Sequence, residues 1–216
     1  LINTWESDNR RYTASLLGQC TRLMVLLGVP MVTGLTVLST PIFQVLTTEA
    51  YLSGAQVLSW VSLGSLSYGF SLLAYTGLIL AKKTTIMARN YLLAGALNVI
   101  LNLIFLPRFG FMAAAVNTAV AYTALLILNT FSATKYLHWL FPWRSLRNAI
   151  VAAGIMAVAL GGLATYVRSA FVALVSSVLI GTVVYLVMLA LLRELTREET
   201  AMLQRVLRRI WKQHAN

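Results

Sequence analysis

Long apolar runs separated by short polar breaks dominate the chain. The runs lack the two-residue alternation of a strand, and a hydrocarbon core of about 30 Å needs about 20 helical residues. Six windows reach this length: Leu23–Phe43, Val57–Ala81, Ile86–Leu106, Phe109–Phe131, Ala149–Val167 and Phe171–Leu192. The pattern therefore predicts an all-α, polytopic membrane protein with six transmembrane helices, and the short linkers make neighbouring helices antiparallel.

Both ends of the chain differ from this membrane unit. We expect residues 1–22 to be a cytoplasmic leading segment, residues 23–192 the six-helix unit, and residues 193–216 a basic cytoplasmic tail. Thr196 and Glu199 form a capping box in the tail, and five apolar residues follow on one helical face. This is typical of an amphipathic helix on an anionic leaflet, with a solvated or partner-binding helix as the alternative. Because the sequence starts at Leu1 and not at a methionine, we expect a fragment of a longer protein.

The composition agrees with a protein that faces lipid. Hydrophobic residues make up 59% of the chain and charged residues only 11%, whereas a soluble domain carries about 25% charged residues. All 17 lysines and arginines except Arg108 and Arg168 fall on one side of the predicted topology. Cationic residues favour the cytoplasmic side, so both termini are predicted to be cytoplasmic. We interpret the net charge of +11 as a topology signal and expect no nucleic-acid partner.

Acidic, histidine and cysteine side chains indicate no chemical centre. All six acidic residues lie outside the predicted spans, so the spans offer no buried carboxylate for a proton or sodium relay. Cys20 is the single cysteine, and neither histidine has neighbours at metal-ligand spacing. His138 belongs to an aromatic segment, Tyr136–Trp143, that suits the headgroup region. We expect no catalytic residue, no metal and no cofactor, and therefore no enzyme.

One side of the second predicted span has soft polarity. Trp60, Gly64, Tyr68, Ser71 and Tyr75 follow one another at intervals of three or four residues, so they share a helical face. Such a face could line a cavity, with rings for sugars and hydroxyl groups for hydrogen bonds. It could equally be a small-residue packing surface with ordinary core aromatics.

The third and fourth predicted spans carry asparagines on either side of a short break. Asn98 and Asn102 are stacked on the third span, ahead of a predicted turn at Pro107–Gly110. Counting from this turn places Asn102 level with Ala114–Ala115 and Asn98 near Thr118. The alanines allow close approach, and amide contacts between membrane helices are worth about 0.6–2 kcal/mol. Helix packing is the favoured role of the asparagines, and lining of a cavity is the alternative.

Three segments resemble one family in their order along the chain. Residues 98–115 read NVILNLIFLPRFGFMAAA and resemble the pattern N-x-x-x-N-L-x-x-I-P-x-F-G-x-x-G-A-A of bacterial polysaccharide flippases, which belong to the multidrug/oligosaccharidyl-lipid/polysaccharide exporter superfamily. Similar family segments match GLILAKKT at 77–84 and LSTPIFQVL at 38–46 with Tyr51 after it. The resemblance covers residues 23 to about 135 well and the remainder only by hydropathy. Ala113 departs from the pattern, because the family usually has glycine there.

This resemblance implies the C-terminal part of a fourteen-helix flippase, in which two bundles surround a cavity with alternating access. It also implies movement of an undecaprenyl-pyrophosphate-linked oligosaccharide across the bacterial cytoplasmic (inner) membrane, for polysaccharide, lipopolysaccharide or O-antigen biosynthesis. Lys82, Lys83 and Arg89 are candidates to meet the pyrophosphate, unless they only reflect topology. The candidate substrate-binding set is completed by Trp60, Tyr68, Tyr75, Asn98 and Asn102.

The expected partners are membrane lipids, the lipid-linked oligosaccharide, the missing N-terminal lobe of the same chain, and glycan polymerase or ligase components. A multidrug antiporter of the same superfamily is an alternative function, although the spans lack carboxylates. A non-transporting membrane scaffold of a glycan-assembly complex is a second alternative. The identity of the glycan and the source of energy do not follow from the sequence.

Overall fold

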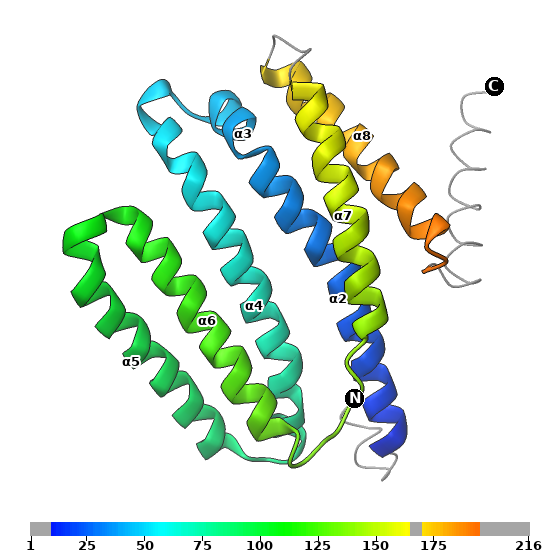
Figure 1. The fold of residues 1–216 in the computed structure, drawn as a ribbon. Coiled ribbons are helices and arrows are strands. Elements are labelled where there is room, and N and C mark those ends of the chain that lie inside the picture. The colour runs from blue at the N-terminus through cyan, green and yellow to red at the C-terminus, as the bar shows by residue number, and fades with distance from the viewer. Residues whose placement is uncertain (1–9, 165–169, 195–216) are drawn as a thin grey trace, which may run out of the picture.

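The computed structural model describes residues 10–164 and 170–194, and all regular structure in these ranges is helical (Figure 1). The elements are α2 (Arg10–Val37), α3 (Ser39–Leu46), the 3-10 helix η1 (Glu49–Gly54), α4 (Ala55–Leu80), α5 (Thr84–Phe109), α6 (Phe111–Ala133), α7 (Trp143–Ala164) and α8 (Ala170–Leu191). Six segments of the described ranges are long and apolar enough to cross a membrane. The predicted all-α, six-span fold is thereby confirmed. The predicted tail helix falls in residues 195–216, outside the described residues.

The helices form two sets that meet at α2. In the first set, α6 lies between α4 and α5, and it packs most extensively on α4 (Figure 1). In the second set, α7 packs on both α2 and α8, and α2 also contacts α4. Because consecutive spans alternate in direction, the described lysines and arginines other than Arg108 lie in the half of the bundle that holds the α4–α5 connection. Which side of the membrane that end faces is a proposal.

The first membrane helix begins earlier than the hydropathy window predicts. It starts at Arg10 and not at Leu23, so residues 10–22 belong to the bundle. Leu17 in this part is fully buried and packs with Leu80 and Leu137. The prediction placed the boundary at the first strongly apolar run, and it therefore missed the helical turns that carry polar side chains at the membrane edge.

The same span is interrupted where the sequence predicted one continuous helix. Helix α2 ends at Val37, and the short helix α3 starts again at Ser39. A proline has no N–H group, so Pro41 leaves the carbonyl of Val37 without the donor that would continue the ladder. The Ser39 hydroxyl instead donates to the carbonyl of Thr36 at 3.0 Å, and this bond satisfies one of the freed carbonyls.

The turn between α5 and α6 is tighter than predicted. Helix α5 continues through Pro107 to Phe109, and the reversal is made at Gly110 alone, with φ 62° and ψ −153°. These backbone angles are open to glycine and strained for other residues. The four-residue turn expected at Pro107–Gly110 is therefore wrong, because a proline in the last helical turn does not end the helix.

Candidate functional site

Asparagines in the second half of α5 contact an asparagine and a threonine near the start of α6, across the tight turn at Gly110. Asn98 Nδ2 donates to Thr118 Oγ1 at 3.4 Å, as the sequence predicted. Asn102 Nδ2 donates to Asn98 Oδ1 at 3.0 Å, and its own Oδ1 accepts from Asn117 Nδ2 at 3.1 Å. Asn102 thus lies level with Asn117 and not with Ala114–Ala115, because the turn is centred on Gly110. The amides satisfy one another in a short chain of hydrogen bonds.

A second, fully buried polar group joins α4, α5 and α6, and the sequence analysis missed it. Asn90 Nδ2 donates to Asn129 Oδ1 at 3.0 Å and to Ser132 Oγ at 3.2 Å. Asn129 Nδ2 donates in turn to Ser71 Oγ at 3.0 Å. Asn90 and Asn129 have no exposed surface, and Asn90 Oδ1 lacks a hydrogen-bond partner. The sequence does carry a signal for this group, because asparagines recur on two adjacent spans. It was missed because Asn90 lies before the motif at residues 98–115.

The soft polar face of α4 divides between two roles. A Cβ at Gly64 would lie 3.0 Å from the Cα of Ala119 in α6, so this glycine permits close helix packing. Ser71 is buried in the contact with α6, as its bond from Asn129 requires. Tyr68 and Tyr75 lie at the edge of that contact and are half-buried. The packing interpretation therefore holds for the small residues, while the tyrosines remain available to a ligand.

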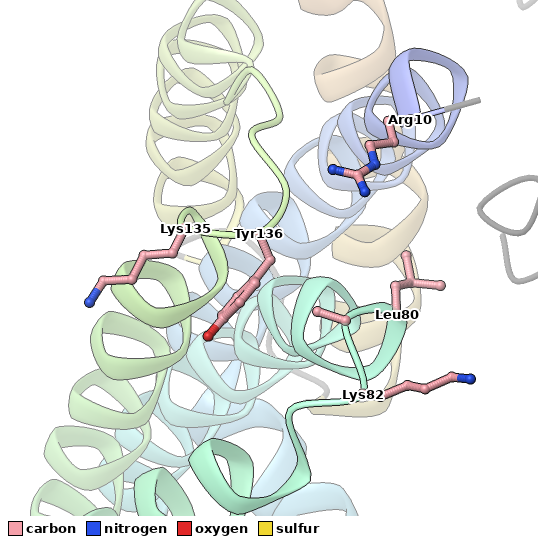
Figure 2. A pocket seen from close by; sticks show the side chains of 6 residues that line it. Arg10, Leu80, Lys82, Lys135 and Tyr136 are labelled. Atoms are coloured by element: carbon pink, nitrogen blue, oxygen red, sulfur yellow. The ribbon is translucent and has the colours of Figure 1, made fainter. Parts of the chain in front are cut away.

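A basic pocket lies at the end of the bundle where the cations gather. It has a volume of about 410 Å³, and the residues that line it are Arg10, Leu80, Ala81, Lys82, Lys135 and Tyr136 (Figure 2). In Figure 2, the ammonium groups of Lys82 and Lys135 point away from one another on opposite sides of the pocket. Three cations, from α2, the α4–α5 connection and the α6–α7 connection, thus line one space. An anionic group could draw the two flexible lysines inward.

Lys82 owes its place to the way α4 ends. Its φ of 55° is left-handed, so its N–H reaches the carbonyl of Ile79 at 2.9 Å and the next N–H reaches that of Leu78 at 3.0 Å. This is a Schellman ending, which usually carries glycine at the left-handed position. The chain reverses within two residues and projects consecutive lysines from the end of the bundle.

The three cations predicted to meet a pyrophosphate do not line one common pocket. Lys82 lines the basic pocket, but its neighbour Lys83 places its ammonium 5.6 Å from the ring centroid of Tyr136. Arg89 is exposed on α5 and is not among the residues that line this pocket. Arg10 and Lys135 line the pocket beside Lys82. Sequence reasoning missed both residues, because they are distant in sequence and approach only when α2 packs beside α4.

An apolar groove runs between α2, α3, α7 and α8. Its volume is about 570 Å³, and its wall on α2 extends from Leu23 to Leu38, a rise of about 22 Å. Leu160 of α7 and Leu186 of α8 complete the opposite wall. The Tyr185 hydroxyl donates to the carbonyl of Leu26 at 2.8 Å and ties α8 to α2 beside the groove. The groove is long, narrow and almost wholly hydrocarbon.

A charged cluster fixes the end of α8 to α2 and α7. The Glu194 carboxylate accepts from Asn148 Nδ2 at 2.8 Å, from the Ser145 hydroxyl, and from Arg22 Nε at 3.4 Å. Arg22 also donates to the backbone carbonyl of Glu194 at 2.6 Å. Glu194 is outside the spans, as predicted, yet only 8% of it is exposed. Its burial beside α2 and α7 was not predicted from the sequence.

Local backbone geometry and electrostatics both hold Glu194 in this position. Arg193 has φ 52°, and the Glu194 N–H bonds to the carbonyl of Leu189 at 3.0 Å, so α8 also has a Schellman ending. Burial by itself would raise the pKa of the Glu194 carboxyl. The hydrogen bonds from Ser145, Asn148 and Arg22, with the charge of Arg22, outweigh burial and bring this pKa below its ordinary value. The carboxylate is thus charged at neutral pH.

The described ranges contain no group of three His, Cys, Asp or Glu side chains that could hold a metal ion. Cys20 is a free, exposed thiol on α2. What the described part of the chain offers is amides, hydroxyl groups, tyrosine rings, a basic pocket and an apolar groove. This set of groups suits recognition of a ligand that is polar at one end and apolar at the other.

Comparison with known proteins gives one informative likeness. No protein-family model and no curated protein sequence matches the chain. The solved structure described as "Lipid II flippase MurJ, inward closed conformation" matches with a TM-score of 0.75 and 22% sequence identity, over 89% of this chain and 42% of that chain. The chain thus spans less than half of the length of that protein. At this identity the likeness establishes a shared helical membrane fold.

The likeness bears on several of the expectations drawn from sequence. The neighbour is named a flippase, and a flippase is a transporter. A multi-pass membrane protein is supported by the six apolar helices together with this fold. Neither a glycan nor an O-antigen precursor is named in the description of the neighbour.

Proposed function

We propose that this chain is the C-terminal part of a flippase that moves an undecaprenyl-pyrophosphate-linked oligosaccharide across the bacterial cytoplasmic membrane for polysaccharide or lipopolysaccharide biosynthesis. The observation that carries the proposal is the fold shared with a protein named for flipping a lipid. That neighbour acts on lipid II by its name, and the oligosaccharide-linked lipid is our extension to this chain. The sequence motifs at residues 38–46, 77–84 and 98–115 support it.

The two hollows suit the two chemically different parts of such a substrate. The basic pocket of Arg10, Lys82 and Lys135 would hold the pyrophosphate, because two phosphates carry charge that ammonium and guanidinium groups bind well. The apolar groove along α2 and α8 would hold the prenyl tail, because burying each CH₂ in hydrocarbon surroundings is worth about 0.8 kcal/mol. Both hollows border α2, with Arg10 about 20 Å along the helix from Leu23.

The organisation of the whole protein follows from the same proposal. Residues 23–192 would form most of the C-terminal lobe, helices from an N-terminal lobe would complete the cavity, and residues 193–216 would bind the cytoplasmic leaflet. The end of the bundle that carries Lys82 and Lys135 would face the cytoplasm, where the lipid-linked substrate is made. Partners would be membrane lipids, the substrate, and polymerase or ligase components of the glycan pathway.

Complementation of a strain that lacks its own glycan flippase tests this function. We expect the full-length gene to restore surface polysaccharide. The double variant Lys82→Ala/Lys135→Ala should fail at normal protein levels. The matched control is Arg144→Ala/Arg147→Ala, which removes two exposed cations of α7 outside the basic pocket.

Failure of the full-length gene to restore polysaccharide in strains with different glycans would contradict the proposal. Resistance to toxic cations or dyes in place of glycan export would identify a multidrug antiporter. Recovery of polymerase activity without any lipid movement would identify a scaffold.

A further inference from the structure

A continuous row of polar and aromatic side chains follows one side of the α4–α5–α6 set, and we call it the polar lane. From the Gly110 end toward the Lys82 end, its members are Asn102, Asn98, Thr118, Tyr122, Tyr68, Tyr91 and Tyr75. Asn102, Asn98 and Thr118 are joined by hydrogen bonds. Tyr122 follows Thr118 by one helical turn, and its ring centroid lies 4.9 Å from that of Tyr68.

The half of the lane nearer Lys82 consists of four tyrosines. Tyr68 and Tyr75 come from α4, Tyr91 from α5 and Tyr122 from α6. Tyr68 and Tyr75 lie two helical turns apart on one side of α4. The rings of Tyr91 and Tyr75 meet edge to face, with centroids 5.9 Å apart. Because α4 and α5 hardly touch each other directly, these tyrosines bridge the two helices across α6. The four tyrosines are all half-buried, so each retains an accessible edge.

Two tyrosines of the lane lie at the middle of their helices. Tyr122 is the middle residue of α6, and Tyr68 lies at the middle of α4. An aromatic belt belongs at the membrane interface and not at this depth. A hydroxyl without a partner in hydrocarbon costs several kcal/mol. Tyrosine hydroxyls near the middle of the membrane therefore need water or a polar ligand beside them.

The lane contains open space at its centre. Gly95 lies on the same face of α5 as Tyr91, Asn98 and Asn102, at helical intervals of three and four residues. A Cβ at Gly95 would have no neighbouring atom within 4 Å. The gap lies between the tyrosine half and the asparagine half of the lane.

We infer that the polar lane is the binding surface for the carbohydrate part of the substrate, an inference that rests on the proposed function. Sugars present apolar C–H faces and many hydroxyl groups, so they are bound by aromatic rings together with amide and hydroxyl partners. The lane offers amides and a hydroxyl in one half and tyrosines in the other along about 16 Å of the bundle, and it carries no charge. A neutral oligosaccharide thus fits it better than an anion or an apolar drug.

The test fills the gap in the lane without changing the packing of the described helices. Gly95→Leu places a side chain in the open space and also favours the helix, because glycine is the weaker helix former. Gly154→Leu in α7 is the matched control, since a Cβ there also meets no atom within 4 Å and Gly154 borders neither the lane nor the groove. Saturation-transfer NMR on the full-length protein in nanodiscs would use maltotriose and triacetylchitotriose as probes.

We expect saturation transfer to the ring C–H protons of at least one trisaccharide in the parent and in Gly154→Leu, and its loss in Gly95→Leu with an unchanged melting temperature. Absence of transfer in the parent, or equal transfer in Gly95→Leu, would overturn the inference. A lower melting temperature for Gly95→Leu alone would also overturn it, because helices of the missing part would then cover the lane. A protein that binds the sugar at the lane but moves no lipid would refute only the proposed function.

Discussion

Arg22 and Glu194 are 172 residues apart in sequence, yet the guanidinium of Arg22 contacts both the carboxylate and the backbone carbonyl of Glu194. The contact joins the middle of α2 to the end of α8. Ser145 and Asn148 of α7 bind the same carboxylate, so three helices converge on one acidic side chain. The bundle that borders the apolar groove is therefore fixed at one end by charge-assisted hydrogen bonds.

Glu194→Gln should lower the free energy of unfolding at pH 7 by about 1–3 kcal/mol, because charge-assisted hydrogen bonds are lost in a buried place. The folded-state pKa is lowered, so the carboxylate stabilises the fold fully above its unfolded pKa of about 4.3. This contribution is lost as the pH falls through the lower folded-state pKa. Thermal unfolding of parent and variant between pH 8 and pH 3 checks this. A difference that grows in acid would contradict the account.

Gly64→Ala should destabilise the protein, because the new Cβ would lie 3.0 Å from the Cα of Ala119, and a backbone atom cannot move aside. The expected cost is about 1–3 kcal/mol, the usual range for overpacking. Gly154→Ala is the control, with open space around its Cβ. Melting temperatures in detergent measure both. Equal melting temperatures for the two variants would show that α4 and α6 are not in close contact at this depth.

Asn129→Leu should lower the amount of folded protein more than Asn98→Leu does. Asn129 is fully buried and serves both Asn90 and Ser71, so its loss strands partners inside the bundle. Asn98 and its two partners, Thr118 and Asn102, are only half-buried. Thr118 keeps a hydrogen bond to the carbonyl of Ala114, and Asn102 Oδ1 still accepts from Asn117. Size-exclusion profiles of the two variants give the comparison. The reverse order would place the main polar packing contact near the Gly110 turn.

Single cysteines should report the orientation of the bundle. In a Cys20→Ser background, a membrane-impermeant reagent added to intact cells should label a cysteine at Ser53 but not one at Thr84. Both positions are exposed, at opposite ends of α4 and its neighbours. Permeabilised cells supply the control, where both should react. Labelling at Thr84 alone in intact cells would invert the proposed topology.

Hydropathy predicts the spans well, because each membrane helix must satisfy its own backbone and be apolar over a set length. Hydropathy predicts the ends of the spans less well. The start of α2 at Arg10 carries polar side chains, and the break before Ser39 depends on one missing N–H at Pro41. Both features are decided by local hydrogen bonding, to which an average over twenty residues is insensitive.

The pairing of Asn98 with Thr118 could be predicted, since a tight turn fixes the register of adjacent helices. Contacts between segments distant in sequence could not. Nothing in the local pattern around Lys135 indicates that it shares a pocket with Arg10. In the sequence alone, Glu194 is likewise an ordinary residue of a charged tail. Its burial follows only from the packing of α2 and α7 around it.

Reconstitution gives the most direct test of the central claim that the full-length protein moves a lipid-linked oligosaccharide. A fluorescent undecaprenyl-pyrophosphate oligosaccharide in liposomes would be exposed to a membrane-impermeant quencher while the quenched fraction is followed over time. The account predicts quenching that proceeds beyond the outer-leaflet pool to nearly all of the probe, slowed by Lys82→Ala/Lys135→Ala and unaffected by Arg144→Ala/Arg147→Ala. Quenching that stops at the outer-leaflet pool, as in protein-free liposomes, would contradict it.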